Sequence, residues 1–134
     1  PPRKDPVPHL NFAPLLNAGG KLKQSAAAFH AKLEGFHVSN RQLTTADTGR
    51  LNQLIYQTER ALIHEPGLPR RPWYRHQIYA PGFYTGYGVK TIPGVREALE
   101  ERKWSEAQEQ IEHAAAALNR LAAQIQLATE TLNP

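Results

Sequence analysis

Three side chains that lie close together in the sequence have the types that bind metal ions. His30, Glu34 and His37 fall on nearly one face of the helix that we expect there. Their spacing differs from the HExxH pattern of zinc hydrolases, in which two histidines four residues apart bind the ion. His37 also lies at the expected end of its helix. We therefore interpret these residues as a solvated helix terminus and predict no metal site here.

The other spacings that could support catalysis are also weak. Glu109 and His113 are four residues apart, which in a helix predicts a surface hydrogen bond rather than a catalytic pair. Gly86 and Gly88 follow Tyr84 but do not have the pattern of a phosphate-binding loop. No serine, histidine and acid are arranged as a nucleophilic triad. The residues themselves therefore predict no enzymatic activity for this chain.

Aromatic and basic side chains are concentrated in one long connection, residues 66–92, which also contains four prolines and four glycines. Irregular connections of this length are usually functional. In one interpretation the rings stack on bases and the arginines neutralise phosphates. In the other, Trp73 and Tyr79 cap a helical bundle and the arginines pair with helix termini. Because the repeated stacking platform of nucleic-acid binders is missing, we expect no nucleic-acid partner.

The composition indicates one globular domain. The chain has 134 residues, of which 40% are hydrophobic and 21% charged, and its net charge of +4 implies no nucleic-acid partner by itself. It contains no cysteine and no apolar run long enough to cross a membrane. It also lacks methionine and begins PPRKDPVPHL. We therefore expect a piece of a longer protein, with a linker at residues 1–10 and a domain at 11–134.

Apolar side chains that recur every three or four residues predict four helices. The paired glycines Gly19–Gly20 weaken the first helix, which could kink or break there. We expect Asn11, Thr91 and Ser105 to act as N-caps. No segment alternates strongly enough to predict a strand. The predicted fold is all-α, an antiparallel four-helix bundle with a long ordered connection between the second and third helices. The helices are expected at residues 11–36, 43–64, 93–102 and 104–132.

One stretch of the sequence resembles a known family. It contains ERALI at residues 59–63, GLPRRPWYRHQIYAP at 67–81 and IPGVREAL at 92–99. The order of these pieces is similar to that in the C-terminal helical domain of the transferrin receptor and glutamate carboxypeptidase group. The predicted helices on either side agree in number and order, so the resemblance covers nearly the whole chain. The shared string is long and specific, and it is closer to the peptidase branch than to the receptor.

The resemblance implies a transferrin receptor-like dimerisation domain that follows a zinc peptidase domain. In that family the helical domain contributes to a homodimer, and its long loop reaches towards the peptidase active site of the same chain. The parent would be a glutamate carboxypeptidase-like di-zinc peptidase whose zinc ligands lie in the preceding domain. No catalytic residue and no cofactor is then implied for this chain. A secreted, periplasmic or cell-surface location, without membrane contact by this domain, is implied in the same way.

The resemblance also implies one substrate-binding residue. Relatives that cleave C-terminal glutamate hold its side-chain carboxylate with a neighbouring lysine and tyrosine, in the segment after IYAP. An alignment without gaps puts that tyrosine at Tyr87 and places Gly86 at the lysine position, where it supplies no charge. Lys90 could substitute only if the loop folded differently. Tyr87 is therefore the candidate, the other interpretation being a tyrosine that packs the loop, and a preference for glutamate is in question.

Four further residues of the loop are predicted to be structural. We expect Arg75 and His76 to brace the loop through hydrogen bonds, and Trp73 and Tyr79 to support the loop or the dimer. One alternative to the peptidase interpretation remains open, a freestanding helical protein-interaction module that functions without a peptidase domain.

Overall fold

The computed structural model describes residues 5–132 and shows a mostly helical chain, which confirms the predicted class. Residues 1–4 and 133–134 lie outside the described part, and so do the beginning of the predicted linker and the end of the predicted domain. The elements are α1 (Ala13–Val38), α2 (Thr45–Tyr56), the 3-10 helix η1 (Thr58–Leu62), β1 (Tyr79–Pro81), β2 (Val89–Thr91), α3 (Pro93–Glu100) and α4 (Trp104–Thr131).

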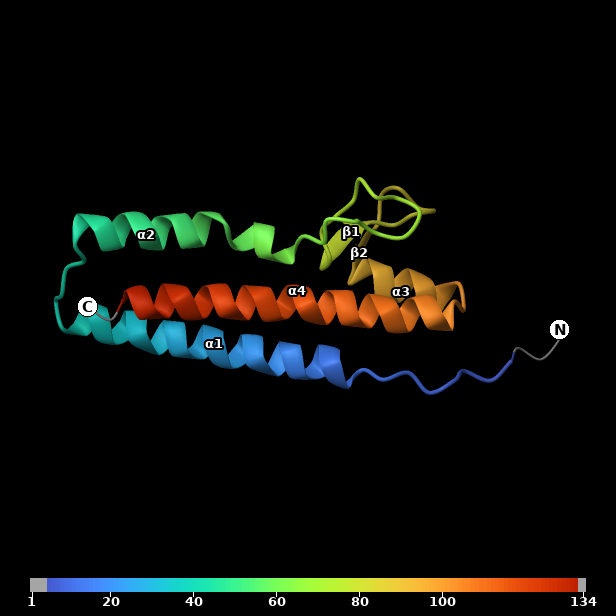
Figure 1. Cartoon of the computed structure of the whole chain (residues 1–134), viewed down its shortest axis with the longest axis horizontal. Coiled ribbons are helices and arrows are strands. Elements are labelled where there is room, and N and C mark those ends of the chain that lie inside the picture. The colour runs from blue at the N-terminus through green and yellow to red at the C-terminus, as the bar shows by residue number, and fades with distance from the viewer. Residues whose placement is uncertain (1–4, 133–134) are drawn as a thin grey trace.

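Helix α4 is the element against which the other helices pack. α1, α2, α3 and η1 all contact it, and Figure 1 shows α1 and α2 along different sides of it. Its inward face is built from alanines, including Ala107, Ala114 and Ala117, around the fully buried Ile111. Alanine side chains allow close approach of neighbouring helices, so the predicted small-residue face of this helix is used for packing.

The helices do not alternate in direction along the chain as an antiparallel bundle requires. Asn11, just before α1, exchanges hydrogen bonds of 2.8 and 3.1 Å with Gln108 in the first turns of α4. At the other ends of these helices, Phe36 and Leu132 line one small cavity. α1 and α4 therefore run parallel, while α2 and α3 follow one another in the opposite direction (Figure 1). Together, α2 and α3 form one antiparallel return path along α4, interrupted by the segment that joins them.

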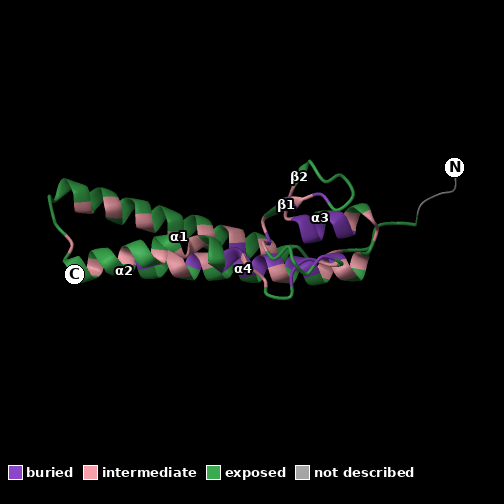
Figure 2. Cartoon of the chain, turned by 90° about the horizontal axis from the view of Figure 1, so that it is seen from above, coloured by how far each residue is buried: buried purple, intermediate pink, exposed green. Residues whose placement is uncertain are grey.

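Burial is uneven along the length of the molecule. Figure 2 shows buried residues concentrated where α3 packs on the N-terminal half of α4. α2 contains no buried residue, and α1 has only Ala18. The hydrophobic stripe of α1 is half-buried, and Ile55 and Tyr56 of α2 are exposed. Of the two long helices α1 and α4, neither is apolar enough to cross a membrane.

The helix boundaries are set by local chemistry that the sequence indicates only in part. Asn11 Oδ1 accepts the N–H of Ala13 at 3.0 Å, close to the predicted cap, and α1 continues without a break through Gly19 and Gly20. The second predicted helix is wrong at its C-terminal end. It begins at Thr45 after a Thr44 cap, ends at Tyr56 and gives way to η1.

Two short strands were missed, and two predicted caps are wrong. β1 pairs antiparallel with β2, with Ala80 opposite Lys90, and each strand has only three residues. Ile92 precedes α3 in a left-handed conformation (φ 48°) without a side-chain cap, and α4 begins one residue before Ser105. Strands this short show no readable alternation, because their pairing is fixed by the segments around them.

Two glycines predict opposite effects of the same substitution. Gly67 has φ +78°, and a Cβ there would lie 2.3 Å from the carbonyl oxygen of Pro72, whereas a Cβ on Gly20 would meet nothing within 4 Å. We expect Gly67→Ala to lower the free energy of unfolding by at least about 2 kcal/mol. Gly20→Ala should raise it by about 0.5–1 kcal/mol. Urea unfolding of both variants checks the prediction, and equal effects would contradict it.

Candidate functional site

The connection between η1 and α3 is an ordered structure attached at both ends. Near its start, His64 donates its backbone N–H to Arg75 at 2.9 Å, and Gln77 donates to Leu62 at 2.9 Å. At its end, Ile92 donates to Ile78 at 2.7 Å beside the β1–β2 pair. These bonds join residues that are far apart in the sequence, so the connection has one defined path.

A buried ion pair fixes this connection to α3. Arg71 is only 3% exposed, and its Nη2 donates to Glu97 Oε2 at 2.8 Å, while Nη1 donates to the carbonyl oxygen of Pro81. The other carboxylate oxygen, Glu97 Oε1, accepts the backbone N–H of Phe83 at 2.8 Å. One arginine and one glutamate thus hold three separate stretches of backbone together.

Local geometry prepares Arg71 for this role. Arg71 lies between two tight turns. Its backbone N–H donates to the carbonyl oxygen of Leu68 at 3.1 Å, and its own carbonyl oxygen accepts the N–H of Tyr74 at 3.0 Å. Its guanidinium lies 5.3 Å from the ring centre of Tyr74 and 5.7 Å from that of Phe83. The planar cation is therefore covered by aromatic rings as well as by hydrogen bonds, which favours arginine over lysine at this position.

More ion pairs surround the buried one. Arg70 makes two hydrogen bonds to Glu106, at 2.8 and 3.0 Å, and lies 3.5 Å from Glu101. The hydrogen bonds to Glu106 raise the pKa of Arg70 above its ordinary value. On the other side, Lys90 pairs with Glu100 of α3, and the pKa of this carboxyl group is lowered as a result. The connection is therefore clamped to both α3 and the start of α4.

The predicted bracing residues make contacts within this connection. Arg75 donates to Glu65 at 2.8 Å, and both side chains are exposed. His76 Nδ1 accepts the N–H groups of Ile78 and Tyr79 at 3.2 Å, so Nε2 carries the proton that points to Glu59 at 3.0 Å. Such contacts are compatible with a bracing role, and that role stays a prediction.

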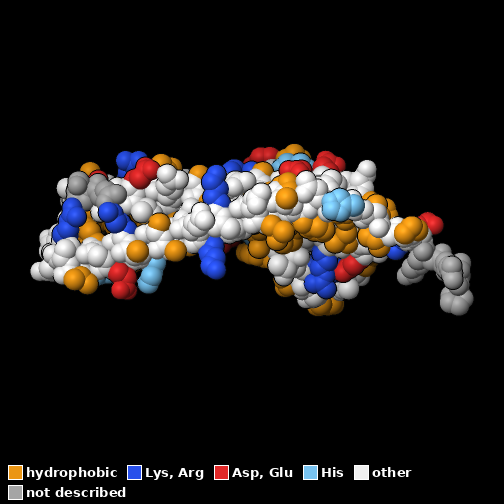
Figure 3. Space-filling model, turned by 90° about the horizontal axis from the view of Figure 1, so that it is seen from below, with side chains coloured by type: hydrophobic (Ala, Val, Ile, Leu, Met, Phe, Trp, Pro, Cys, Tyr) orange, Lys and Arg blue, Asp and Glu red, His pale blue; other side chains and the backbone are white. Residues whose placement is uncertain are grey.

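Most aromatic rings of the connection lie on the surface. Trp73 is 71% exposed and Tyr79 53%, so neither ring plugs the end of the helices as the capping interpretation required. Tyr79 rests on the His76 ring with centroids 4.1 Å apart. Tyr87 is fully exposed at the tip, next to Gly86 in a left-handed conformation. Figure 3 shows hydrophobic side chains gathered in the half of the molecule that contains α3 and the beginning of α1.

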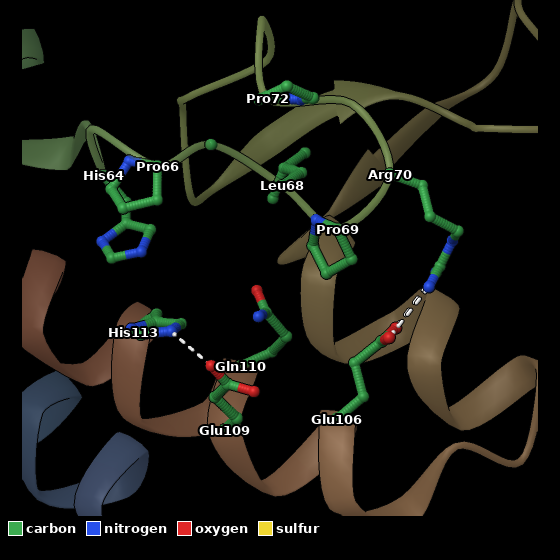
Figure 4. Close-up of a pocket in the computed structure, with 11 residues that line it drawn as sticks. His64, Pro66, Leu68, Pro69, Arg70, Pro72, Glu106, Glu109, Gln110 and His113 are labelled. Atoms are coloured by element: carbon green, nitrogen blue, oxygen red, sulfur yellow. Dashed lines mark hydrogen bonds and ion pairs between the residues drawn. The ribbon is translucent and has the colours of Figure 1, made fainter.

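A surface cavity of about 370 Å³ lies between the start of the connection and α4. In Figure 4 the ring of His64 faces that of His113, and their centroids are 4.0 Å apart. His113 Nε2 lies 3.4 Å from Glu109, and the buried Oε1 of Gln110 has no hydrogen-bond partner among the described residues. The predicted pairing of Glu109 with His113 is present, but the stacked histidines were not predicted.

The described residues contain no group of three or more histidine, aspartate or glutamate side chains that could hold a metal ion. His30 and Glu34 are 3.9 Å apart, and both are exposed on α1. The residues between 5 and 132 therefore do not fit a zinc site, and we derive no catalytic step through a metal for them. Glutamates also pair with Arg70, Arg71 and Arg75, so these arginines present little unpaired charge to phosphates.

No local sequence pattern predicts the residues that hold the connection. Arg71 and Glu97 are 26 positions apart, and nothing local to either residue indicates a partner. The same is true of Arg120 in α4, which donates to the carbonyl oxygens of Ala61 and Ile63 at 3.0 and 2.8 Å. One of the two interpretations of the loop expected its arginines to pair with helix termini. Arg70 does so, because it pairs with Glu106 in the first turn of α4.

Comparison with known proteins identifies a family profile that matches most of the chain and relatives that match parts of it. The profile of the transferrin receptor-like dimerisation domain matches residues 10–126. A probable glutamate carboxypeptidase of Arabidopsis thaliana is 37% identical over 94 residues, which are 65% of this chain and 13% of the relative. A probable glutamate carboxypeptidase of Arthroderma benhamiae is 43% identical over 68 residues, which are 51% of this chain and 9% of the relative.

A third relative is named as an inactive protease. An inactive zinc metalloprotease of Schizosaccharomyces pombe is 31% identical over 77 residues, which are 58% of this chain and 10% of that protein. The matched segments thus span only about a tenth of the length of these relatives.

The buried ion pair predicts a strong asymmetry between single and double substitutions. Glu97→Gln leaves a buried guanidinium without its counter-charge and should lower the free energy of unfolding by about 3–5 kcal/mol. Replacing both partners, as in Arg71→Met with Glu97→Leu, should recover much of that loss. Urea unfolding measures all variants, with Arg75→Met at the exposed pair as a control costing about 0–1 kcal/mol. A Glu97→Gln effect no larger than this control would contradict the assigned role.

The stacked histidines predict a pH-dependent stability. Burial lowers the pKa of His64 below its ordinary 6.5, His113 and Arg120 lower it further, and Glu109 opposes them. Since unfolded His64 binds its proton more tightly, the free energy of unfolding should fall as pH drops below 6.5 and through the lower folded pKa. Urea unfolding at about pH 7.5 and about pH 5 measures this loss.

The control for this measurement is a histidine whose side chain is exposed. His64→Gln should reduce the loss of stability on acidification, whereas His30→Gln on the exposed face of α1 should leave it unchanged. If His64→Gln lost as much stability as the wild type, the effect would have to come from other groups.

Proposed function

The chain belongs to the transferrin receptor-like dimerisation domain family, and we propose that it is the non-catalytic dimerisation domain of a glutamate carboxypeptidase-like zinc peptidase. The match of the family profile over residues 10–126 is the observation that carries this proposal. The partners are a second copy and the peptidase domain of the same chain, with no nucleic acid and no membrane contact. The location is secreted, periplasmic or at the cell surface.

The incompletely buried half of the molecule supports a dimer. Between α1 and α2 lies an apolar groove of about 160 Å³, whose walls include Phe29 of α1, Ile55 of α2 and Ile125 of α4. α2 buries no residue fully within this chain, and its apolar side chains are half-buried or exposed, so its apolar face is only partly packed. A second copy seated over this groove would bury them, and the helices of the two copies would together complete a bundle.

The ordered connection supports a role in a substrate pocket. Its base is clamped to α3 and α4 by Arg71 and Arg70, while its tip carries exposed aromatic side chains. A stiff base with an exposed tip can present side chains to another domain without losing conformational entropy on contact. In this proposal, residues 66–92 help to complete the substrate pocket of the peptidase domain, and Tyr87 contacts the substrate.

The zinc of this proposal belongs to the peptidase domain. Support for it comes from the relative named as an inactive zinc metalloprotease and from the peptidase names of the others. When bound there, zinc would supply an activated water and polarise the peptide carbonyl. The contribution of the present residues is to bind and orient the substrate.

Dimerisation predicts a mass in solution of twice the 15.0 kDa of one chain. Ile55→Lys places a charge in the groove and should raise the dissociation constant of the dimer at least about tenfold. Size-exclusion chromatography with light scattering over a concentration series measures it. Gln126→Lys is the matched control, because it adds the same charge to α4 near a different cavity, lined by Gln24 and Ala28. A wild-type monomer at all concentrations, or equal effects of the two variants, would contradict the proposed face.

A further inference from the structure

We propose that the tip of the 66–92 connection selects peptides whose C-terminal residue is uncharged, apolar or aromatic, rather than glutamate. This inference rests on the proposed function, because it takes the tip to line the substrate pocket of the peptidase domain. It adds the class of substrate, and it differs from what the names of the relatives suggest.

The exposed tip, residues 82–89, contains no charged side chain. Its large side chains are aromatic or aliphatic, and Tyr84, Tyr87 and Val89 are 75%, 100% and 69% exposed. Two backbone hydrogen bonds close the turn, from Gly82 to Gly88 at 2.8 Å and from Gly86 to Gly82 at 3.1 Å. Phe83 meets Tyr84 edge to face at 4.8 Å between centroids. The surface that the tip offers is therefore fixed in shape and apolar, with phenol hydroxyls as its polar side-chain groups besides Thr85.

The cations near the tip are already paired with carboxylates of this domain. Lys90 is turned to Glu100, and its side chain is 15% exposed. Arg71 is buried against Glu97, and Arg70 makes its two bonds to Glu106. A substrate carboxylate at the tip would have to displace one of these glutamates to gain a positive partner.

A substrate carboxylate and an uncharged substrate side chain need different surroundings. Such a group is stable in a partly closed pocket only when a cation or several N–H donors replace its water. Tyr87 offers one hydroxyl hydrogen, and Gly86 beside it offers no side chain. An uncharged residue gains instead from contact with the aromatic rings, because both surfaces leave water.

The experiment uses the full-length protein that carries this domain, with zinc, and a series of peptides that differ only in the C-terminal residue. The series contains glutamate, its neutral isostere glutamine, leucine and phenylalanine. We expect kcat/KM for leucine and phenylalanine to exceed that for glutamate about tenfold or more, with glutamine in between. A preference for glutamate in the wild-type protein would overturn the inference.

Two variants at one position isolate the missing charge. Gly86 has φ +67°, and a Cβ there would meet nothing within 4 Å, so any side chain pays the same backbone cost but has room. Gly86→Lys should shift the ratio of kcat/KM for glutamate over leucine at least about tenfold towards glutamate. Gly86→Gln carries the same strain without the charge and should leave this ratio near that of the wild type. Equal shifts in the two variants would also overturn the inference.

Failure of the proposed function gives a different pattern. If the full-length protein hydrolyses no peptide of the series, or if Tyr87→Ala leaves kcat/KM unchanged for every peptide, the tip does not line a substrate pocket. The proposed function then fails, and the inference fails with it. Hydrolysis that depends on Tyr87 but favours glutamate removes the inference alone.

Discussion

The buried pair of Arg71 and Glu97 is the constraint on which the shape of the long connection depends. The two side chains together bind each other, the carbonyl of Pro81 and the N–H of Phe83. A buried pair of this kind contributes little net stability compared with an apolar core, because both charges lose their water. The pair instead restricts the connection to one conformation, since a shift of either backbone segment would leave a charge buried without its partner.

This constraint divides the molecule into a well-packed half and an open half. At one end α3, the connection and the N-terminal half of α4 share the buried core. At the other end α1 and α2 lie along α4 with apolar side chains that are half-buried or exposed, apart from the buried Ala18 of α1. The two halves suit different tasks, because a rigid end can present a fixed surface and an incompletely packed end gains most from a partner.

The sequence predicts the helices well and the contacts between distant segments poorly. The periodic run from Trp104 to the end of α4 is visible because each apolar position repeats a local pattern. The pairing of Arg71 with Glu97 and the three-residue strands depend on segments brought together only by folding. The left-handed conformation of Ile92 is unusual for a β-branched residue and is imposed by the turn from β2 into α3. For the site, the resemblance located the connection, while its exposed and buried faces needed the structure.

The distribution of charge explains why a basic chain can have an uncharged tip. The net charge is +4, yet Arg70, Arg71 and Lys90 of the connection are paired with glutamates of α3 and α4. Among residues 5–132, the cations without an ion pair include Lys21, Lys23 and Lys32 of α1, Arg50 of α2 and Arg60 of η1, all outside the 66–92 connection. Screening limits the reach of exposed charges to about 8–10 Å at ordinary salt, so a charge outside the connection acts on the tip only from close by. In the proposed substrate pocket, the selectivity of the tip would therefore depend on its own rings and on the missing side chain at Gly86, rather than on the overall charge of the domain.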